Sequence, residues 1–240
     1  MVSDTAVIYR EIPRRAAELL AGLRGLGVAD VYDALPPAAR ETCLMDGFIP
    51  PVTHGLEAHG QAITAFCPQG DSLMSHCALY LARPGDVIVI SNGGVSRGAV
   101  WGAAMTHDAT VTGIAGAIID APVRDVALTR EMQFPLWARA VSAAPGEKSG
   151  KGYVNMPVSC GGRTVNPGDI VIADDDGVLV FSPDHIEAVL QTTSRILQRQ
   201  ADLRHRIARG ERLFETQNFA QLLGAKQIEI RAECWRDGSA

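Results

Sequence analysis

Arg124 and Asp125 are adjacent residues of opposite charge at a point where a strand pattern gives way to a helix pattern. The apolar run at residues 114–119 predicts a buried strand, and Pro122 predicts a helix start that places the pair in the first helical turn. In α/β folds, ligands bind beyond the carboxyl ends of strands, near helix N-termini that favour anions. There a carboxylate can hold a divalent cation and a guanidinium can neutralise a carboxylate or enolate oxygen. The alternative is a helix-capping acid beside a surface salt bridge.

Three other groups of polar residues have a chemical and a structural interpretation. Asp71 follows Gly70 and precedes an expected helix, so we expect it to cap that helix rather than act in catalysis. His76, one turn later, is expected to be a packed interior histidine. The acidic run at residues 174–176 could hold a metal, but Gly177 and the strand residues after it favour a tight hairpin turn.

The elements that position these residues alternate along the first part of the chain. After helices within residues 12–35, separated at Gly27, the pattern is strand, loop and helix in repetition. This alternation favours a mainly parallel sheet with helices packed on it. The expected elements are strands at residues 57–67 and 87–90 and helices at residues 72–82 and about 98–111.

The second part of the chain has a different pattern. Its short apolar segments are separated by Pro-Gly and Asp-rich turns, which predicts hairpins and therefore a mixed central sheet. A long helix follows at about residues 184–209. We expect one domain over residues 1–240, with a core at about 12–215 and a helical tail at about 215–240. The expected strands are residues 136–141, 154–158, 169–173 and 177–181.

Composition narrows the class of protein. The chain has 240 residues, 47% of them hydrophobic and 20% charged, with a net charge of −5, which argues against a nucleic-acid partner. No apolar run is as long as the roughly 18 residues that a membrane span needs. We expect no signal peptide and a cytoplasmic location. The five cysteines are scattered without paired spacing, so we expect free thiols.

Several motifs together resemble the RraA-like family. They are Gly70-Asp71, Pro84-Gly85-Asp86, Val123-Arg124-Asp125 and the segment from Pro167 through Gly177. The segment at residues 128–141 is especially similar to the class II pyruvate aldolases of this family, 4-hydroxy-4-methyl-2-oxoglutarate aldolase and 4-carboxy-4-hydroxy-2-oxoadipate aldolase. The resemblance covers roughly residues 12–215.

The resemblance implies a fold and a set of site residues. The family has a three-layer α/β fold related to swivelling domains, with a mixed central sheet and a long C-terminal helix. Asp125 matches the family's ligand for Mg²⁺ or Mn²⁺, and Arg124 matches the arginine beside the 2-oxo group of pyruvate. Asp120 is expected to assist catalysis by supporting Arg124 or the water around the metal, or else to serve a strand-end turn. The residues expected to bind substrate are Gly93, Gly94, Arg97, Gly102, Ala103, Ala104, Met105 and Arg124.

The implied activity is a metal-dependent lyase reaction on a small 2-oxo or 2-hydroxy dicarboxylic acid. Retro-aldol cleavage to pyruvate would pass through a metal-bound enolate whose charge Arg124 shares, with a water-relayed base taking the proton of the 4-hydroxyl. Decarboxylation of oxaloacetate leaves the same enolate and needs no such base. The family also implies a homotrimer or a dimer of trimers with active sites between subunits.

The chain departs from the aldolase pattern at one conspicuous position. The aldolases carry an acid directly after the glycine that matches Gly102, but this chain has Ala103 there, twenty-one residues before Arg124. His107 could compensate or be structural, and Asp202 is a candidate for an acid from a neighbouring subunit. Arg97 could bind a distal carboxylate or be a solvated loop residue. Two alternatives therefore stay open: a lyase acting on another small acid, and an RraA-like regulatory binding protein.

Overall fold

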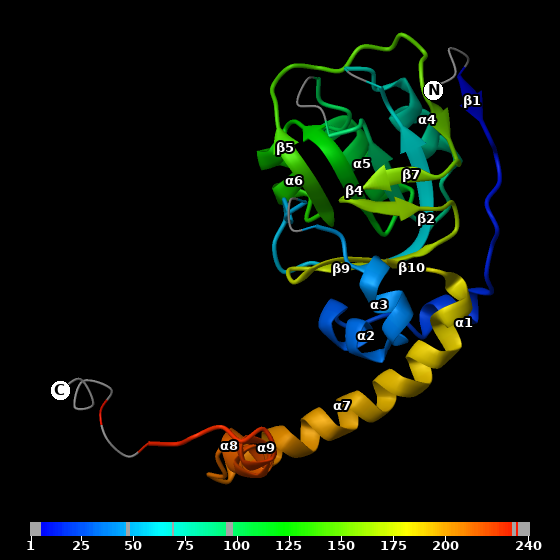
Figure 1. The fold of residues 1–240 in the computed structure, drawn as a ribbon. Helices are drawn as coiled ribbons and strands as arrows, with labels where there is room; N and C mark the ends of the chain where they lie inside the picture. The colour runs from blue at the N-terminus through cyan, green and yellow to red at the C-terminus, as the bar shows by residue number, and fades with distance from the viewer. Residues whose placement is uncertain (1–5, 47–48, 69, 95–97, 232–233, 235–240) are drawn as a thin grey trace. The chain divides into compact units, whose positions relative to one another are not determined.

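A mixed β-sheet lies at the centre of the fold (Figure 1). The computed structural model describes residues 6–46, 49–68, 70–94, 98–231 and 234. Neighbouring strands follow the order β1-β6-β2-β3-β4-β5, and the pairs β2–β3, β3–β4 and β4–β5 are parallel. These strands are β1 Val7–Ile8, β2 Ala58–Phe66, β3 Val87–Ser91, β4 Gly116–Val123, β5 Leu136–Val141 and β6 Tyr153–Val154.

Antiparallel pairing makes the sheet mixed, as the sequence predicts. Strand β2 pairs antiparallel with β6 and with β9, and β9 pairs antiparallel with β10. Strands β7 and β8 form a separate two-stranded sheet. The bounds are β7 Val158–Cys160, β8 Arg163–Val165, β9 Ile170–Asp174 and β10 Gly177–Phe181.

The two faces of the central strands pack against different layers because side chains alternate along a strand. Ile63, Ile88 and Ile119 point into one cluster with residues of the helices α4 and α5. Ala62, Val89 and Ile118 point into a second cluster with β7 to β10. This arrangement confirms the predicted three-layer α/β architecture. The helices are α1 Ala17–Ala21, α2 Val28–Ala34, α3 Pro37–Cys43, α4 Leu73–Leu81, α5 Ala103–Val111 and α6 Val126–Glu131.

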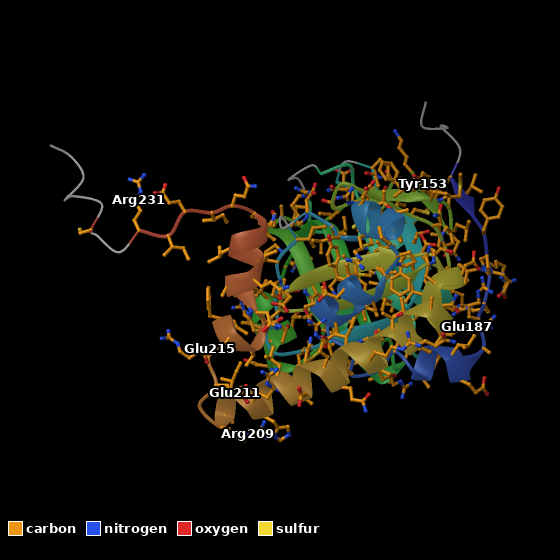
Figure 2. The ribbon with its side chains drawn as sticks, turned by 60° about the horizontal axis from the view of Figure 1, so that its bottom comes forward. Tyr153, Glu187, Arg209, Glu211, Glu215 and Arg231 are labelled. Atoms are coloured by element: carbon orange, nitrogen blue, oxygen red, sulfur yellow. The ribbon has the colours of Figure 1, made fainter. Side chains whose placement is uncertain are left out.

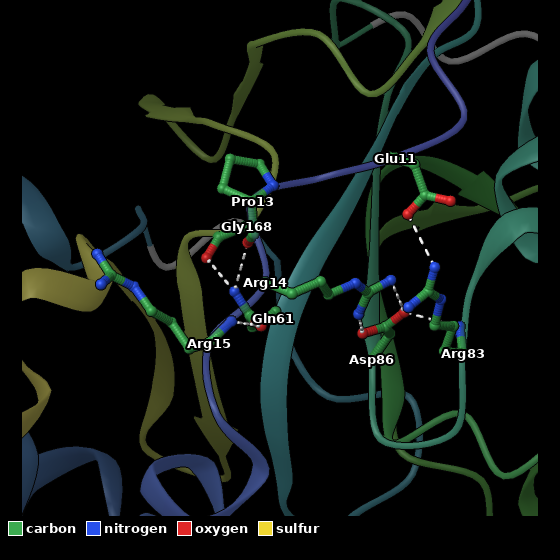
Figure 3. A network of polar contacts seen from close by, with 8 residues as sticks. All are labelled: Glu11, Pro13, Arg14, Arg15, Gln61, Arg83, Asp86 and Gly168. Atoms are coloured by element: carbon green, nitrogen blue, oxygen red, sulfur yellow. Dashed lines mark hydrogen bonds and ion pairs between the residues drawn. The ribbon is translucent and has the colours of Figure 1, made fainter.

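A polar network ties the N-terminal segment to β2 and to the Pro-Gly-Asp turn before β3 (Figure 3). The Gln61 amide nitrogen donates to the carbonyls of Pro13 and Gly168 at 3.0 and 2.9 Å, and its oxygen accepts from the N–H of Arg15 at 2.9 Å. Arg14 forms an ion pair with Asp86, whose carboxylate also accepts from the N–H of Arg83 at 2.7 Å. These bonds satisfy the buried Gln61 and Asp86 side chains.

Two predicted helix starts were wrong, and both errors lie beside the candidate site. The helix expected from about residue 98 begins at Ala103, because Ala99 and Trp101 are held in extended backbone by bridges to Pro145 and Val123. Pro122 lies inside β4 and does not open a helix. The β4–β5 register shifts between Ile119 and Pro122, and such an irregularity accommodates a residue that has no N–H to donate.

A smaller difference concerns the strand expected at residues 154–158. It consists of β6, which ends at Val154, and β7, which starts at Val158. The intervening Asn155 has a positive φ of 56°, which breaks the extended backbone. The hairpin expected at residues 174–177 is confirmed by the pairing of Gly177 with Asp174.

The chain divides into two units, residues 1–193 and residues 194–240. The helix α7, Ile186–Ala208, begins in the first unit, and the second unit also contains α8, Leu213–Thr216, and α9, Phe219–Ala225. Within the second unit Arg206 bonds Glu211 at 2.8 Å just past the end of α7, where Figure 2 labels Arg209 and Glu211. None of the helices that the structure describes is long and apolar enough to cross a membrane.

Candidate active site

The carboxyl end of β4 pairs with a short extended segment that precedes α5. The N–H of Val100 donates to the Pro122 carbonyl, and the N–H of Arg124 donates to the Trp101 carbonyl, both at 3.0 Å. Arg124 and Asp125 therefore follow the last residue of β4 directly, and α6 begins only at Val126. The predicted position past a strand end is correct, but the pair precedes the helix rather than forming its first turn.

Asp125 occupies an unusual backbone conformation at the start of α6. Its φ of 57° lies in the left-handed region, which few residues other than glycine adopt and which Asp tolerates better than most. Such strain persists where the surrounding structure holds it, and it clusters at functional sites. At Asp125, the hydrogen bonds that Arg124 and the N–H of Ala103 donate to the carboxylate hold the residue in this conformation.

Gly102 is required because Arg124 and Asp125 pack directly over it. A Cβ on this glycine would lie 2.9 Å from both the Arg124 Cγ and the Asp125 Oδ2, closer than real contacts allow. The Asp125 carboxylate accepts from Arg124 Nε at 3.3 Å and from the N–H of Ala103 at 3.2 Å. The side chains of Arg124 and Asp125 nevertheless remain 40% and 32% exposed. The pair is thus fixed in place without being sealed from solvent.

The first turn of α5 has backbone donors without an acceptor inside the helix, and they lie beside this pair. The intrahelical ladder begins with the N–H of Thr106, which donates to the Gly102 carbonyl at 3.0 Å. The N–H groups of Ala104 and Met105 precede that bond and have no intrahelical acceptor. Such groups at a helix N-terminus favour an anion.

These groups line one cavity of about 220 Å³, a volume suited to a small acid. It brings together the predicted residues Gly102, Ala104, Met105, Arg124 and Asp125 with residues far from them in the sequence. The other lining residues are Ser72, His76, Ala99, Val100, Trp101, Pro145, Gly146 and Lys148.

Other predicted site residues lie outside this lining. Ala103 contributes through its N–H bond to Asp125, and its side chain is a methyl group. Gly93 and Gly94 are exposed in the loop after β3, each with a positive φ. Arg97 lies outside the described residues. The roles proposed for these residues stay predictions.

Asp120 has partners other than the expected Arg124. Its carboxylate forms an ion pair with Arg139 of β5 and accepts from the N–H of Gly161 at 2.8 Å. The Asp120 side chain is 7% exposed. This carboxylate thus connects β4 to β5 and to the turn between β7 and β8. A role of Asp120 in catalysis stays a prediction.

Hydrogen bonds hold the loop at residues 143–150 at the rim of the cavity. Ala99 exchanges backbone bonds with Ala144 and Gly146 at 2.8 and 3.0 Å, and the N–H of Ser72 donates to the Glu147 carbonyl at 2.7 Å. A Cβ on Gly146 would lie 2.8 Å from the Ser72 Cβ, so the loop needs glycine there to approach α4. These contacts position Lys148, which no sequence motif singled out.

The carboxylate of Asp71 also holds this loop in place through hydrogen bonds. It accepts from the N–H of Leu73 at 2.7 Å, as expected for a cap, and also from the backbone N–H and hydroxyl of Ser149 and the N–H of Gly150. Burial raises the pKa of Asp71, but the hydrogen bonds from Ser149 and Leu73 outweigh it and hold the pKa below its usual value.

His76 is exposed, so the expectation of a packed interior histidine was wrong. It lines the cavity instead, because the first turn of α4 faces the loop that carries Lys148. Partial burial, and then the nearby Lys148, lower the pKa of His76. A helix pattern cannot reveal this role, since the residues opposite His76 come from distant parts of the chain.

The acidic run that begins at the last residue of β9 has structural partners. Asp174 accepts from the N–H groups of Val28 and Asp176 at 2.8 Å, and Asp175 accepts from the N–H of Gly55 at 2.9 Å. Within the described part of the chain, no group of three or more His, Cys, Asp or Glu residues could hold a metal ion. His107 and Asp202 are exposed, and His107 does not line the cavity.

Comparison with known proteins identifies relatives of this chain. A family model described as RraA-like, Aldolase/RraA, matches residues 28–180. A protein of Halalkalibacterium halodurans, provisionally named 4-hydroxy-4-methyl-2-oxoglutarate aldolase, is 35% identical over 170 residues, 67% of this chain and 80% of that protein.

Solved structures share the fold. An uncharacterized protein from Pseudomonas syringae pv. tomato has a TM-score of 0.75 at 25% identity, over 87% of this chain and 97% of its own. Streptomyces coelicolor RraAS2, described as an unusual member of the RNase ES inhibitor RraA protein family, has a TM-score of 0.73 at 24% identity, over 81% of this chain and 99% of its own. The family model, the relative and the shared fold agree with the resemblance seen in the sequence motifs, and the chain belongs to the RraA-like family.

Proposed function

We propose that this protein is a lyase that cleaves a carbon–carbon bond in a small 2-oxo or 2-hydroxy dicarboxylic acid and releases pyruvate. One observation carries the proposal: Arg124, Asp125 and the free N–H groups of α5 line the same small cavity. The aldolase name of the Halalkalibacterium halodurans relative supports the reaction class.

The chain's own groups suit an enolate-forming cleavage. The N–H groups of Ala104 and Met105 bind the substrate carboxylate at the start of α5. The guanidinium of Arg124 faces the 2-oxo oxygen and stabilises the negative charge that develops there as the bond breaks. The leaving fragment is a carbonyl compound in a retro-aldol reaction and carbon dioxide in the decarboxylation of oxaloacetate.

A divalent cation fits the donor chemistry of the cavity. Asp125 supplies one partly exposed carboxylate, and Mg²⁺ or Mn²⁺ can be held by one carboxylate together with water and substrate oxygens. When bound at Asp125, such a cation supplies Lewis-acid polarisation of the 2-oxo group. A tetrahedral zinc site would need more protein ligands than this cavity offers.

Pyruvate release tests the proposal directly. Purified protein with Mg²⁺ or Mn²⁺ should release pyruvate from oxaloacetate or from 4-hydroxy-4-methyl-2-oxoglutarate, measured by coupled reduction of pyruvate. Removal of the cation with a chelator and the substitution Asp125→Ala should each abolish release. Absence of pyruvate from both substrates, or full activity of Asp125→Ala, contradicts the proposal.

Ala103 favours a second candidate, in which the chain acts on another small acid or only binds a partner, as an RraA-like regulator would. Titration calorimetry with Mg²⁺ or Mn²⁺ distinguishes the lyase from a regulator that only binds a partner. Binding that is strengthened by pyruvate supports the lyase, and no binding with or without pyruvate supports the regulator.

We also propose a cytoplasmic homotrimer or dimer of trimers, in which Asp202 of a neighbouring subunit approaches the site. The exposed apolar side chains of Leu213, Phe214, Phe219 and Leu222 in the second unit support self-association. Light scattering of the purified protein would give the subunit number, and a monomer at assay concentration would contradict this assembly.

A further inference from the structure

His76 is a titratable side chain of the cavity that the enolate-stabilising pair leaves unused. It lines the same cavity as Arg124 and Asp125, and the residue is exposed. Among the contacts of the described residues, none engages its ring nitrogens, so the imidazole is available to a bound molecule or to water.

A retro-aldol reaction needs a group that takes the proton of the 4-hydroxyl. The guanidinium of Arg124 offers only hydrogen-bond donors, and the Asp125 carboxylate is bonded to Arg124 and Ala103 and is assigned to the cation. Position 103 carries only a methyl group. The imidazole is the side chain of this cavity whose ordinary pKa lies closest to neutrality.

We propose that His76 is the proton acceptor for the 4-hydroxyl group, directly or through one water, a role that rests on the proposed lyase function. The imidazole takes the hydroxyl proton as the C3–C4 bond breaks. The electron pair of that bond passes to the 2-oxo group as the enolate, and the former hydroxyl carbon becomes a carbonyl. The imidazolium then returns the proton to C3, which yields pyruvate and restores the neutral imidazole.

The surroundings of His76 support a neutral imidazole. Lys148 faces it from the loop at the cavity rim, and Arg10 shares a groove with it beside the N-terminal strand. Cys77 and Tyr80 of α4 line that groove, while Arg124 and Asp125 stand in the cavity. Partial burial first, and then the positive charge of Lys148, disfavour the imidazolium and lower the pKa of His76.

Two substrates separate this role from a structural one. In His76→Asn, turnover of 4-hydroxy-4-methyl-2-oxoglutarate should fall about 10²- to 10⁴-fold, the usual contribution of a positioned base. Decarboxylation of oxaloacetate should change little, because it removes no hydroxyl proton and its enolate can take a proton from water. His107→Asn, an exposed histidine of α5 outside the cavity, is the matched control and should leave both reactions unchanged.

Equal losses with both substrates, or no loss with either, would overturn the assignment of His76. If the unaltered protein releases no pyruvate from either substrate, the proposed function itself fails, and this role fails with it. Lys148→Met gives a measurement that leaves His76 in place. Loss of the positive charge should raise the pKa of His76 and move the acid limb of the aldol pH profile to higher pH, and an unmoved limb contradicts the proposal.

Discussion

Two Arg–Asp pairs lie near the carboxyl end of β4, and their surroundings differ. Asp120 is nearly fully buried and is bonded to Arg139 and to the N–H of Gly161. Asp125 has similar partners, a guanidinium and the N–H of Ala103, but both members of its pair remain open to a cavity. The two carboxylates are five residues apart in the chain.

The difference shows that residue type and spacing alone do not separate structural from functional charge pairs. A carboxylate that is buried is out of reach of a ligand, and removal of one member of its ion pair leaves an uncompensated charge. A half-exposed pair held over a glycine keeps its geometry and can still meet a substrate. The following four substitutions test that distinction.

Arg124→Met should have the largest effect, on catalysis. Loss of the guanidinium removes the group that stabilises the enolate, and we expect pyruvate release to fall about 10²- to 10³-fold. The free energy of unfolding should change little, because the side chain is 40% exposed. Steady-state kinetics and urea unfolding measure the two quantities. A large loss of stability with normal turnover would show that Arg124 has a structural rather than a catalytic role.

Asp120→Ala should act mainly on stability. Removal of one member of a buried ion pair costs about 3 kcal/mol, and the cost stays at the low end of the usual range because Arg139 keeps contact with solvent. Urea unfolding would measure the loss. A strong fall in turnover with unchanged stability would instead place Asp120 in the reaction, as the sequence resemblance implied.

Gly102→Ala should damage the exposed pair without removing a charge. The φ of Gly102 is extended and open to alanine, so the effect is steric: the new Cβ meets Arg124 and Asp125. We expect kcat/KM to fall at least about tenfold, since small displacements of catalytic groups are costly, with a smaller loss of stability. Normal kinetics for this variant would show that the packing over Gly102 is not required.

Asp71→Asn should have the smallest effect, and one that depends on pH. The pKa of Asp71 is lowered in the folded protein, so its stabilisation is present above the unfolded pKa and is lost as pH falls through the folded pKa. We expect the variant to lose about 1 kcal/mol near pH 7, because an amide nitrogen cannot accept the bonds that Ser149 and Gly150 donate to the carboxylate, and to lose less at acid pH. Unfolding curves at neutral and acid pH would check this; an equal difference at both would contradict it.

Local patterns predicted much of the fold correctly. The strands β2, β3, β5 and β10, the helices α4 and α7 and the hairpin at Gly177 follow from apolar periodicity and turn residues. The patterns failed where a tertiary contact overrides local preference. Pro122 reads as a helix start, yet the irregular β4–β5 register keeps it in a strand.

The sequence by itself determined the mixed α/β fold, the family and the place of Arg124 and Asp125 past a strand end, because these depend on short-range patterns and on motifs. Only the tertiary structure decided that Asp120 pairs with Arg139 and that His76 and Lys148 share a cavity with Arg124 and Asp125. The register of the parallel strands and the hydrogen-bonded loop at residues 143–150 bring these side chains together. Contacts between such distant parts of a chain depend on packing that no local pattern encodes.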